Sequence, residues 1–126
     1  MTQIKVNVIL VNQNKILVIK RRKEDGDFWQ TITGTLAGGE SLLDTIKREV
    51  REECGINEIK VNLDPVYCFV WKKGKDDVLE PVFLAHTSKK EIILSEEHTE
   101  YKWLSVKEAV EIVKTENNKL AILKAF

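Results

Sequence analysis

The sequence has no surplus of either charge. Its 126 residues include twenty Lys and Arg residues and twenty Asp and Glu residues, so the formal net charge at pH 7 is zero. Proteins that hold a nucleic acid or an anionic membrane usually carry a basic excess, because each phosphate contact releases counterions. The balance argues against both kinds of partner, and any phosphate recognition must be local.

Cysteine is scarce as well. Cys54 and Cys68 have neither the number nor the spacing of a disulfide scaffold or a zinc site, so we expect two reduced, buried thiols, as is usual in the cytoplasm. No apolar run approaches the roughly 20 residues that a membrane-spanning helix needs, and the N-terminus lacks the basic head and apolar core of a signal peptide. The sequence therefore predicts a soluble cytoplasmic protein.

What the chain does contain fits one compact domain over residues 1–126, with 43% hydrophobic and 32% charged residues. Alternating apolar residues predict strands, and capping residues predict helices. We expect strands over residues 4–11, 16–19, 29–33, 61–71, 78–87, 91–94 and 101–104, and helices over residues 42–54, 106–113 and 118–125. Pro65 and Pro81 lie inside two of these strands and indicate edges or bulges, because proline cannot donate a backbone hydrogen bond.

The most informative segment is the helix expected between Ser41, a good N-cap, and Gly55, a helix stop. Its apolar side chains form one stripe, and Glu49, Glu52 and Glu53 lie at or near the margin of that stripe. Carboxylates that share a partly buried edge repel one another unless a cation compensates them, and Mg²⁺ prefers oxygen ligands. A surface helix stabilised by pairs of Glu and Arg is the alternative interpretation.

A glycine-rich loop precedes this helix. Gly34, Gly38 and Gly39 allow the backbone to bend tightly or to approach a ligand closely. Such a loop is weak evidence by itself. Its position between a strand and a helix with three carboxylates favours a metal and phosphate site.

These residues resemble the signature of the Nudix hydrolase family, and every defining position of that signature is filled. The pattern is Gly34, five residues, Glu40, seven residues, Arg48-Glu49, the hydrophobic Val50, Arg51, Glu52-Glu53, Cys54, Gly55 and the hydrophobic Ile56. The resemblance implies an α+β fold of Nudix type, an α/β/α sandwich whose mixed β-sheet is packed between helices. It also implies hydrolysis of a nucleoside diphosphate linked to another group, with Mg²⁺ or, alternatively, Mn²⁺ as the cofactor.

The same resemblance implies roles for individual side chains. Glu49, Glu52 and Glu53 match metal ligands, and Glu49 also matches the base that activates the attacking water, directly or through the metal. Arg48 and Glu40 match an ion pair that fixes the loop against the helix, and we count both with Glu49 as catalytic groups.

Further residues, all but Gly34 outside the signature, resemble the branch of the family that cleaves dihydroneopterin triphosphate and dATP. They are residues 27–30, the Thr33-Gly34 pair, the Glu97-His98 pair and residues 101–104. That resemblance implies a further metal ligand in Glu97 and substrate contacts from Lys5, Arg21 and Thr33.

Aromatic side chains could stack on a flat ring in the substrate. We expect Trp29 at the substrate site with Gly34, although core packing suits Trp29, Tyr67 and Trp71 better when each is taken alone. The two histidines, His86 and His98, show no metal-ligand spacing and predict structural or solvent roles.

The sequence thus predicts a metal-dependent pyrophosphohydrolase that cleaves a nucleoside or pterin triphosphate to the monophosphate and pyrophosphate. An asymmetric diadenosine tetraphosphate hydrolase is the alternative, because residues 94–104 also resemble those enzymes. A non-catalytic nucleotide-binding Nudix module is a further alternative, which the complete set of carboxylates disfavours. We expect a small-molecule partner, no nucleic acid, no membrane, and a monomer or a homodimer.

Overall fold

A seven-stranded mixed sheet lies at the centre of the computed structural model, which describes residues 2–126. The strands are β1 (Thr2–Asn12), β2 (Lys15–Arg21), β3 (Trp29–Gln30), β4 (Ile32–Thr35), β5 (Lys60–Lys73), β6 (Asp76–His86) and β7 (His98–Leu104). The helices are α1 (Leu42–Cys54), α2 (Val106–Ile112) and α3 (Glu116–Ala125), and a 3₁₀ turn, η1, spans Lys23–Asp25.

Strand β1 organises the sheet because its two edges have different partners. One edge pairs in parallel with β6, which pairs in turn with β5. The other edge is shared, since residues 5–8 pair with β4 and residues 11–12 pair with β2. Strand β2 then leaves β1 and pairs with β3 and β7. On this edge of β1 the sheet therefore splits into two parts, and β4 pairs with the N-terminal part of β1 while β2 pairs with its C-terminal end.

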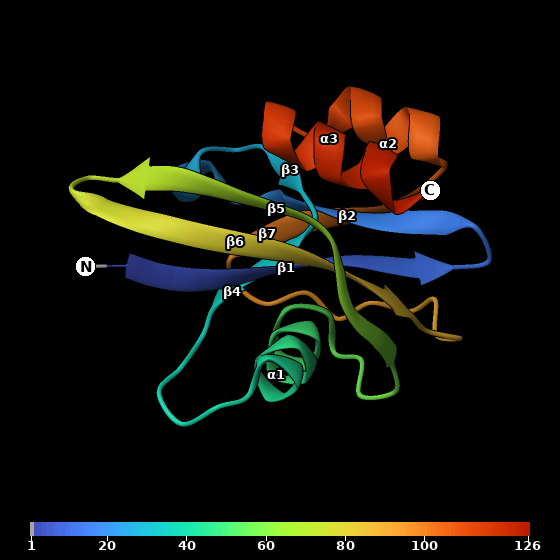
Figure 1. Cartoon of the computed structure of the whole chain (residues 1–126). Coiled ribbons are helices and arrows are strands. Elements are labelled where there is room, and N and C mark those ends of the chain that lie inside the picture. Colours follow the sequence, from blue (N-terminus) through green and yellow to red (C-terminus); the bar gives the residue numbers. More distant parts are fainter. Residues whose placement is uncertain (1) are drawn as a thin grey trace.

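Helices cover both faces of the sheet, as Figure 1 shows, with α1 on one side and α2 and α3 on the other. The alternation along β1 produces this arrangement, because successive strand side chains point to opposite faces. Val6, Val8 and Leu10 pack with Ile46 and Val50 of α1. The other face is packed against α2 and α3 by a second cluster, which includes Ile9, Val11, Ala109, Val113, Ala121 and Ile122. The predicted sandwich is confirmed.

Capping residues set the bounds of α1 as the sequence predicts. The Ser41 hydroxyl accepts a hydrogen bond from the Asp44 backbone N–H (3.1 Å), which satisfies a donor that the first turn leaves free. Gly55 ends the helix with φ of 72°, a left-handed conformation that glycine adopts without steric cost. Within residues 2–126, no helix is both long and apolar enough to cross a membrane.

Several sequence predictions need correction. Residues 91–94 form no strand, because the Ile93 N–H donates to the carbonyl of Cys54 (2.9 Å) and so attaches this segment to the end of α1. β7 begins at His98 and α3 at Glu116, both earlier than predicted. The predicted bulge near Pro65 is confirmed by the register shift between Asn62 and Tyr67.

Pro81 and Cys68 also differ from expectation. Pro81 lies in β6, which has neighbours on both sides, so it is not in an edge strand. The recorded pairs between β1 and β6 stop at Leu79 and resume at Val82, and the register is unchanged across this gap. Cys68 is exposed, whereas Cys54 is buried as predicted, because alternate residues of the edge strand β5 face solvent. Both thiols are free.

Candidate active site

Arg48 joins the glycine-rich loop to α1. Its guanidinium donates to both oxygens of Glu40, with Nε–Oε2 and Nη2–Oε1 distances of 2.8 and 3.0 Å. It also donates to the Thr35 carbonyl (3.2 Å), to Glu49 Oε1 (2.8 Å) and to Glu52 Oε2 (3.3 Å). The hydrogen bond from Arg48 holds the pKa of Glu40 at about 2. The loop is therefore fixed by a planar group whose geometry matches a carboxylate.

Glu49 lies against the backbone of β4 at Gly34. A Cβ atom built on Gly34 would overlap the Glu49 side chain, so any larger residue here would force Glu49 to move. The side chain of Glu49 is almost fully buried, and burial raises the pKa of its carboxyl group. Arg48 opposes that increase, while the charges of Glu53 and Glu52 add to it. Gly34 thus sets the place of the carboxylate that the sequence predicts to be the base.

Glu53 is held from the segment that precedes β7. His98 Nδ1 donates to Glu53 Oε2 (2.7 Å), and the Ser95 hydroxyl donates to the same oxygen (2.9 Å). Burial opposes ionisation of Glu53, but the hydrogen bonds from His98 and Ser95 outweigh it, so the pKa of Glu53 lies below its usual value. The contact of His98 with Glu53 goes beyond the general structural role that the sequence predicts for this histidine.

The carboxylates of α1 have the right chemistry to hold a divalent cation. One oxygen of each of Glu49, Glu52 and Glu53 takes part in the bonds described above, and among residues 2–126 the other oxygen accepts no hydrogen bond. Three carboxylate oxygens are thus free for a hard cation such as Mg²⁺. Within the described residues, no three His, Cys, Asp or Glu side chains converge as a preformed metal site. Water and substrate phosphates would have to complete the coordination, as they usually do for Mg²⁺.

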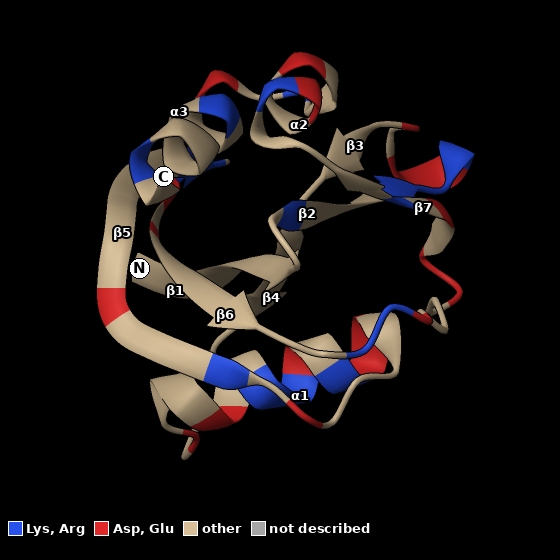
Figure 2. Cartoon of the chain, turned by 90° about the vertical axis from the view of Figure 1, so that its right-hand side faces the viewer, with Lys and Arg blue, Asp and Glu red and all other residues tan. Residues whose placement is uncertain are grey.

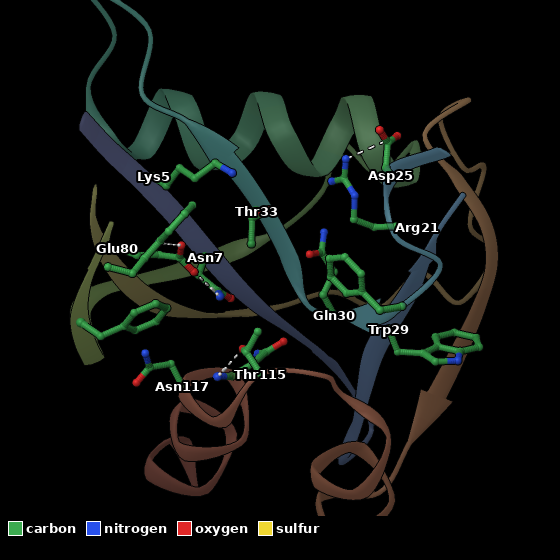
Figure 3. A pocket seen from close by; sticks show the side chains of 14 residues that line it. Lys5, Asn7, Arg21, Asp25, Trp29, Gln30, Thr33, Glu80, Thr115 and Asn117 are labelled. Atoms are coloured by element: carbon green, nitrogen blue, oxygen red, sulfur yellow. Dashed lines mark hydrogen bonds and ion pairs between the residues drawn. The ribbon is translucent and has the colours of Figure 1, made fainter. Parts of the chain in front are cut away.

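A cavity of about 500 Å³ opens on the face of the sheet that α3 covers, and no residue of α1 lines it. Its aromatic lining consists of Phe28, Trp29, Phe69 and Trp71. Lys5 and Arg21 line the part of the cavity that lies toward α1 in Figure 3. The volume lies within the range of sites for small molecules.

Lys5 and Arg21 connect this cavity electrostatically to α1. Burial lowers the pKa of Lys5, and the charges of Glu80 and Glu49 act on it in the opposite direction. Arg21 lies near enough to Glu53 to contribute to the low pKa of that carboxyl group, and it forms an ion pair with Asp25 (3.5 Å). Figure 2 shows further acidic and basic residues side by side along α1.

The structure brings most of the predicted site residues together. Lys5, Arg21, Thr33 and Trp29 all line the cavity, and Gly34 contacts Glu49 next to it. Trp71 also lines the cavity, whereas Tyr67 is partly buried against the core cluster beneath α2 and α3, as Trp29 also is.

Glu97 lies just before β7, where its backbone carbonyl accepts a hydrogen bond from the Arg22 N–H (2.9 Å). Its role as a metal ligand stays a prediction. Glu97 follows Ser95 closely in the chain and precedes His98, so it belongs to the segment that holds Glu53.

Sequence reasoning missed the polar floor of the cavity, which is lined by Asn7, Glu80 and Asn118 and supported by the fully buried Thr31, which bonds to both asparagines. Asn7 was the available signal, because a single amide in a run of buried apolar strand residues needs a hydrogen-bond partner. Its partner, Glu80, is 73 residues away in the chain, and no residue pattern around Glu80 indicates that it contacts Asn7.

Comparison with known proteins agrees with this geometry. The NUDIX domain family matches the whole chain, residues 1–126. The chain therefore belongs to the Nudix family, and it is an enzyme of the MutT-like hydrolase type that acts on pyrophosphate bonds. Enzymes of this family generally use a divalent metal and small nucleotide-like substrates.

Individual relatives show how far the likeness extends. A dihydroneopterin triphosphate diphosphatase of Haemophilus influenzae is 31% identical over 124 residues, which cover 88% of this chain and 78% of the relative. The structure of the E. coli dihydroneopterin triphosphate pyrophosphohydrolase superposes with a TM-score of 0.81 at 25% identity, over 94% of this chain and 91% of that one. A C. elegans Ap4A hydrolase has a TM-score of 0.86 at 17% identity, over 98% and 94% of the two chains, which shows the shared fold alone.

Proposed function

We propose that this chain is a Mg²⁺-dependent pyrophosphohydrolase, folded as a single Nudix domain, that cleaves a nucleoside or pterin triphosphate to the monophosphate and pyrophosphate. The observation that carries the proposal is that Lys5 and Arg21 line a cavity of small-molecule size and also interact electrostatically with Glu49 and Glu53 of α1. A substrate whose ring occupies the cavity would extend its phosphates past these two cations toward α1.

Basic side chains bind the substrate in this proposal. Arg21 offers a planar fork of N–H donors that matches phosphate oxygens, and Lys5 offers a compact positive charge. Thr33, which pairs with Asn7 in the sheet, lies at the cavity wall between β1 and β4. The aromatic walls hold the ring and exclude water from its faces.

Glu49, Glu52 and Glu53 would hold the metal ions. Bound Mg²⁺ supplies positive charge that stabilises the phosphate oxygens and lowers the pKa of bound water. Glu49 would hold the metal at its free carboxylate oxygen and would act as the base through that metal, while Gly34 and Arg48 keep its other oxygen in place. Arg48 and Glu40 position the loop without contacting the substrate.

The test is product identification after incubation with dATP, dGTP, dihydroneopterin triphosphate and diadenosine tetraphosphate. We expect pyrophosphate and a monophosphate from at least one triphosphate, with turnover that requires Mg²⁺ or Mn²⁺. The Glu53→Gln variant should lose more than about a hundredfold in kcat, in line with the loss of a group that acts on the transition state. Two unequal nucleotides from diadenosine tetraphosphate, with no turnover of any triphosphate, would favour the alternative hydrolase instead.

A further inference from the structure

A buried carboxylate lies in the wall of the cavity, and the catalytic role proposed for α1 makes no use of it. Glu80, on β6, is 6% exposed and lines the cavity on the opposite side from Arg21 in Figure 3. Within residues 2–126, no Lys, Arg or His nitrogen lies within the 4.0 Å of an ion pair with this carboxylate. The charge of Lys5 acts on Glu80 from beyond ion-pair distance. A buried charge without a cation in contact is costly, and such a group needs hydrogen-bond donors in its place.

The hydrogen bonds in the floor of the cavity have a fixed direction. The Thr31 backbone N–H donates to Asn118 Oδ1 (3.2 Å), so the Asn118 amide must present Nδ2 to the Thr31 hydroxyl (2.9 Å). The single hydroxyl proton of Thr31 then goes to Asn7 Oδ1 (2.6 Å). Asn7 therefore presents its Nδ2 to Glu80 Oε2 (2.9 Å). The chain of donors ends at Glu80, which is its acceptor.

Glu80 retains capacity for further donors. Its other oxygen, Oε1, accepts from the indole N–H of Trp71 (3.0 Å). An ionised carboxylate has about four acceptor sites, so two protein donors leave room for about two more. Both protein donors also hold the carboxylate in one orientation, since Asn7 and Trp71 approach different oxygens.

We propose that Glu80 selects a ring with two adjacent N–H donors, the 2-amino-4-oxo pyrimidine edge that guanine and pterins share. This inference rests on the proposed function, because it assigns the ring of that triphosphate to this cavity. The ring N–H and the exocyclic amine of such an edge both point the same way and can reach one carboxylate. Adenine and cytosine place a ring-nitrogen lone pair beside their amine, and that lone pair is repelled by the carboxylate. A uracil or thymine ring offers one N–H between two carbonyl groups.

Binding without metal and without turnover tests the proposal directly. Titration calorimetry should show that the wild-type protein binds dGMP at least about tenfold more tightly than dAMP, because a charge-assisted pair of hydrogen bonds has no counterpart in adenine. In Glu80→Gln, which replaces one acceptor by a donor, that ratio should fall to about threefold or less. The matched control is Glu111→Gln, an exposed residue of α2 outside the cavity, and it should keep the wild-type ratio.

Two further arms complete the experiment. Neopterin should displace dGMP if the pterin is the preferred ring, and dGMP that resists displacement assigns the site to guanine. If Glu80→Gln does not fold, as judged by circular dichroism, Glu80→Asp retains the charge on a shorter side chain and should bind dGMP more weakly than wild type.

Equal wild-type affinities for dGMP and dAMP, no binding of either nucleotide, or a ratio unchanged in Glu80→Gln would overturn the proposal. Turnover is not involved in this measurement. The proposed function fails separately, if the wild-type protein releases no pyrophosphate from any triphosphate. Equal hydrolysis of triphosphates with different bases would refute only the role of Glu80.

Discussion

Replacement of Gly34 by alanine should damage the site through one added methyl group. The backbone at Gly34 is outside the left-handed region, so alanine can adopt its conformation, and the nearest obstacle is the Glu49 side chain. Relief of that overlap requires Glu49 to move, which would also break its 2.8 Å hydrogen bond to Arg48. Added atoms in a packed site usually cost about 1–3 kcal/mol of stability. A misplacement of a reacting group by about 1 Å can reduce kcat by about a hundredfold.

The assay compares Gly34→Ala with Gly38→Ala, measuring urea unfolding and the rate of triphosphate hydrolysis for each. Gly38 lies in the same loop, has no positive φ, and has no atom within 4 Å of a Cβ built on it. Gly38→Ala should therefore be neutral or stabilise the protein by about 0.4–1 kcal/mol through the unfolded state. If Gly34→Ala matches Gly38→Ala in both stability and kcat, the role of Gly34 as space for Glu49 is wrong.

Three other predictions concern the supports of the site. Arg48→Lys should reduce kcat at least about tenfold. A lysine cannot donate hydrogen bonds to both oxygens of Glu40 and to the Thr35 carbonyl at the same time. An unchanged kcat would contradict this prediction. The pKa of Glu40 is lowered to about 2, so its contribution to stability is present above pH about 4.5 and is lost as the pH falls toward 2. Urea unfolding should show wild type and Glu40→Gln converging over that range, and a constant difference would refute it. Thr31→Val should destabilise the fold by about 1–3 kcal/mol in urea unfolding, because it leaves Asn7 Oδ1 buried without a donor.

Local patterns in the sequence predict α1 and its loop well. The cap at Ser41 and the stop at Gly55 depend on residues next to the helix, so both bounds of α1 could be predicted. The contact between Arg48 and Glu40 was expected from the Nudix resemblance, and the structure records it at 2.8 Å. The catalytic roles of both residues stay predictions.

Contacts between distant strands could not be predicted in the same way. Glu80 meets Asn7 because β6 and β1 pair in parallel, and neither residue has a sequence neighbour that announces the other. His98 reaches Glu53 because the segment before β7 folds onto the end of α1. The strand expected over residues 91–94 failed for the same reason, since that segment bonds to α1 and not to the sheet. Tertiary pairing decided each of these positions.

The exposed glutamate of α1 provides a clean way to examine the carboxylate site. Glu52 has one weak contact, at 3.3 Å from Arg48, so its replacement by glutamine should leave the fold intact. Glu53, by contrast, also supports the bonds from Ser95 and His98. A loss of metal affinity in Glu52→Gln would therefore report on coordination and not on folding.

The central claim is that the carboxylates of α1 hold divalent ions, and Mn²⁺ binding followed by electron paramagnetic resonance tests it most directly. Wild type and the control Glu111→Gln should bind Mn²⁺ with the same affinity, while Glu52→Gln and Glu53→Gln should each bind at least about tenfold more weakly, as expected when one of a few charged ligands is removed. Equal Mn²⁺ affinity in all four proteins would contradict the account.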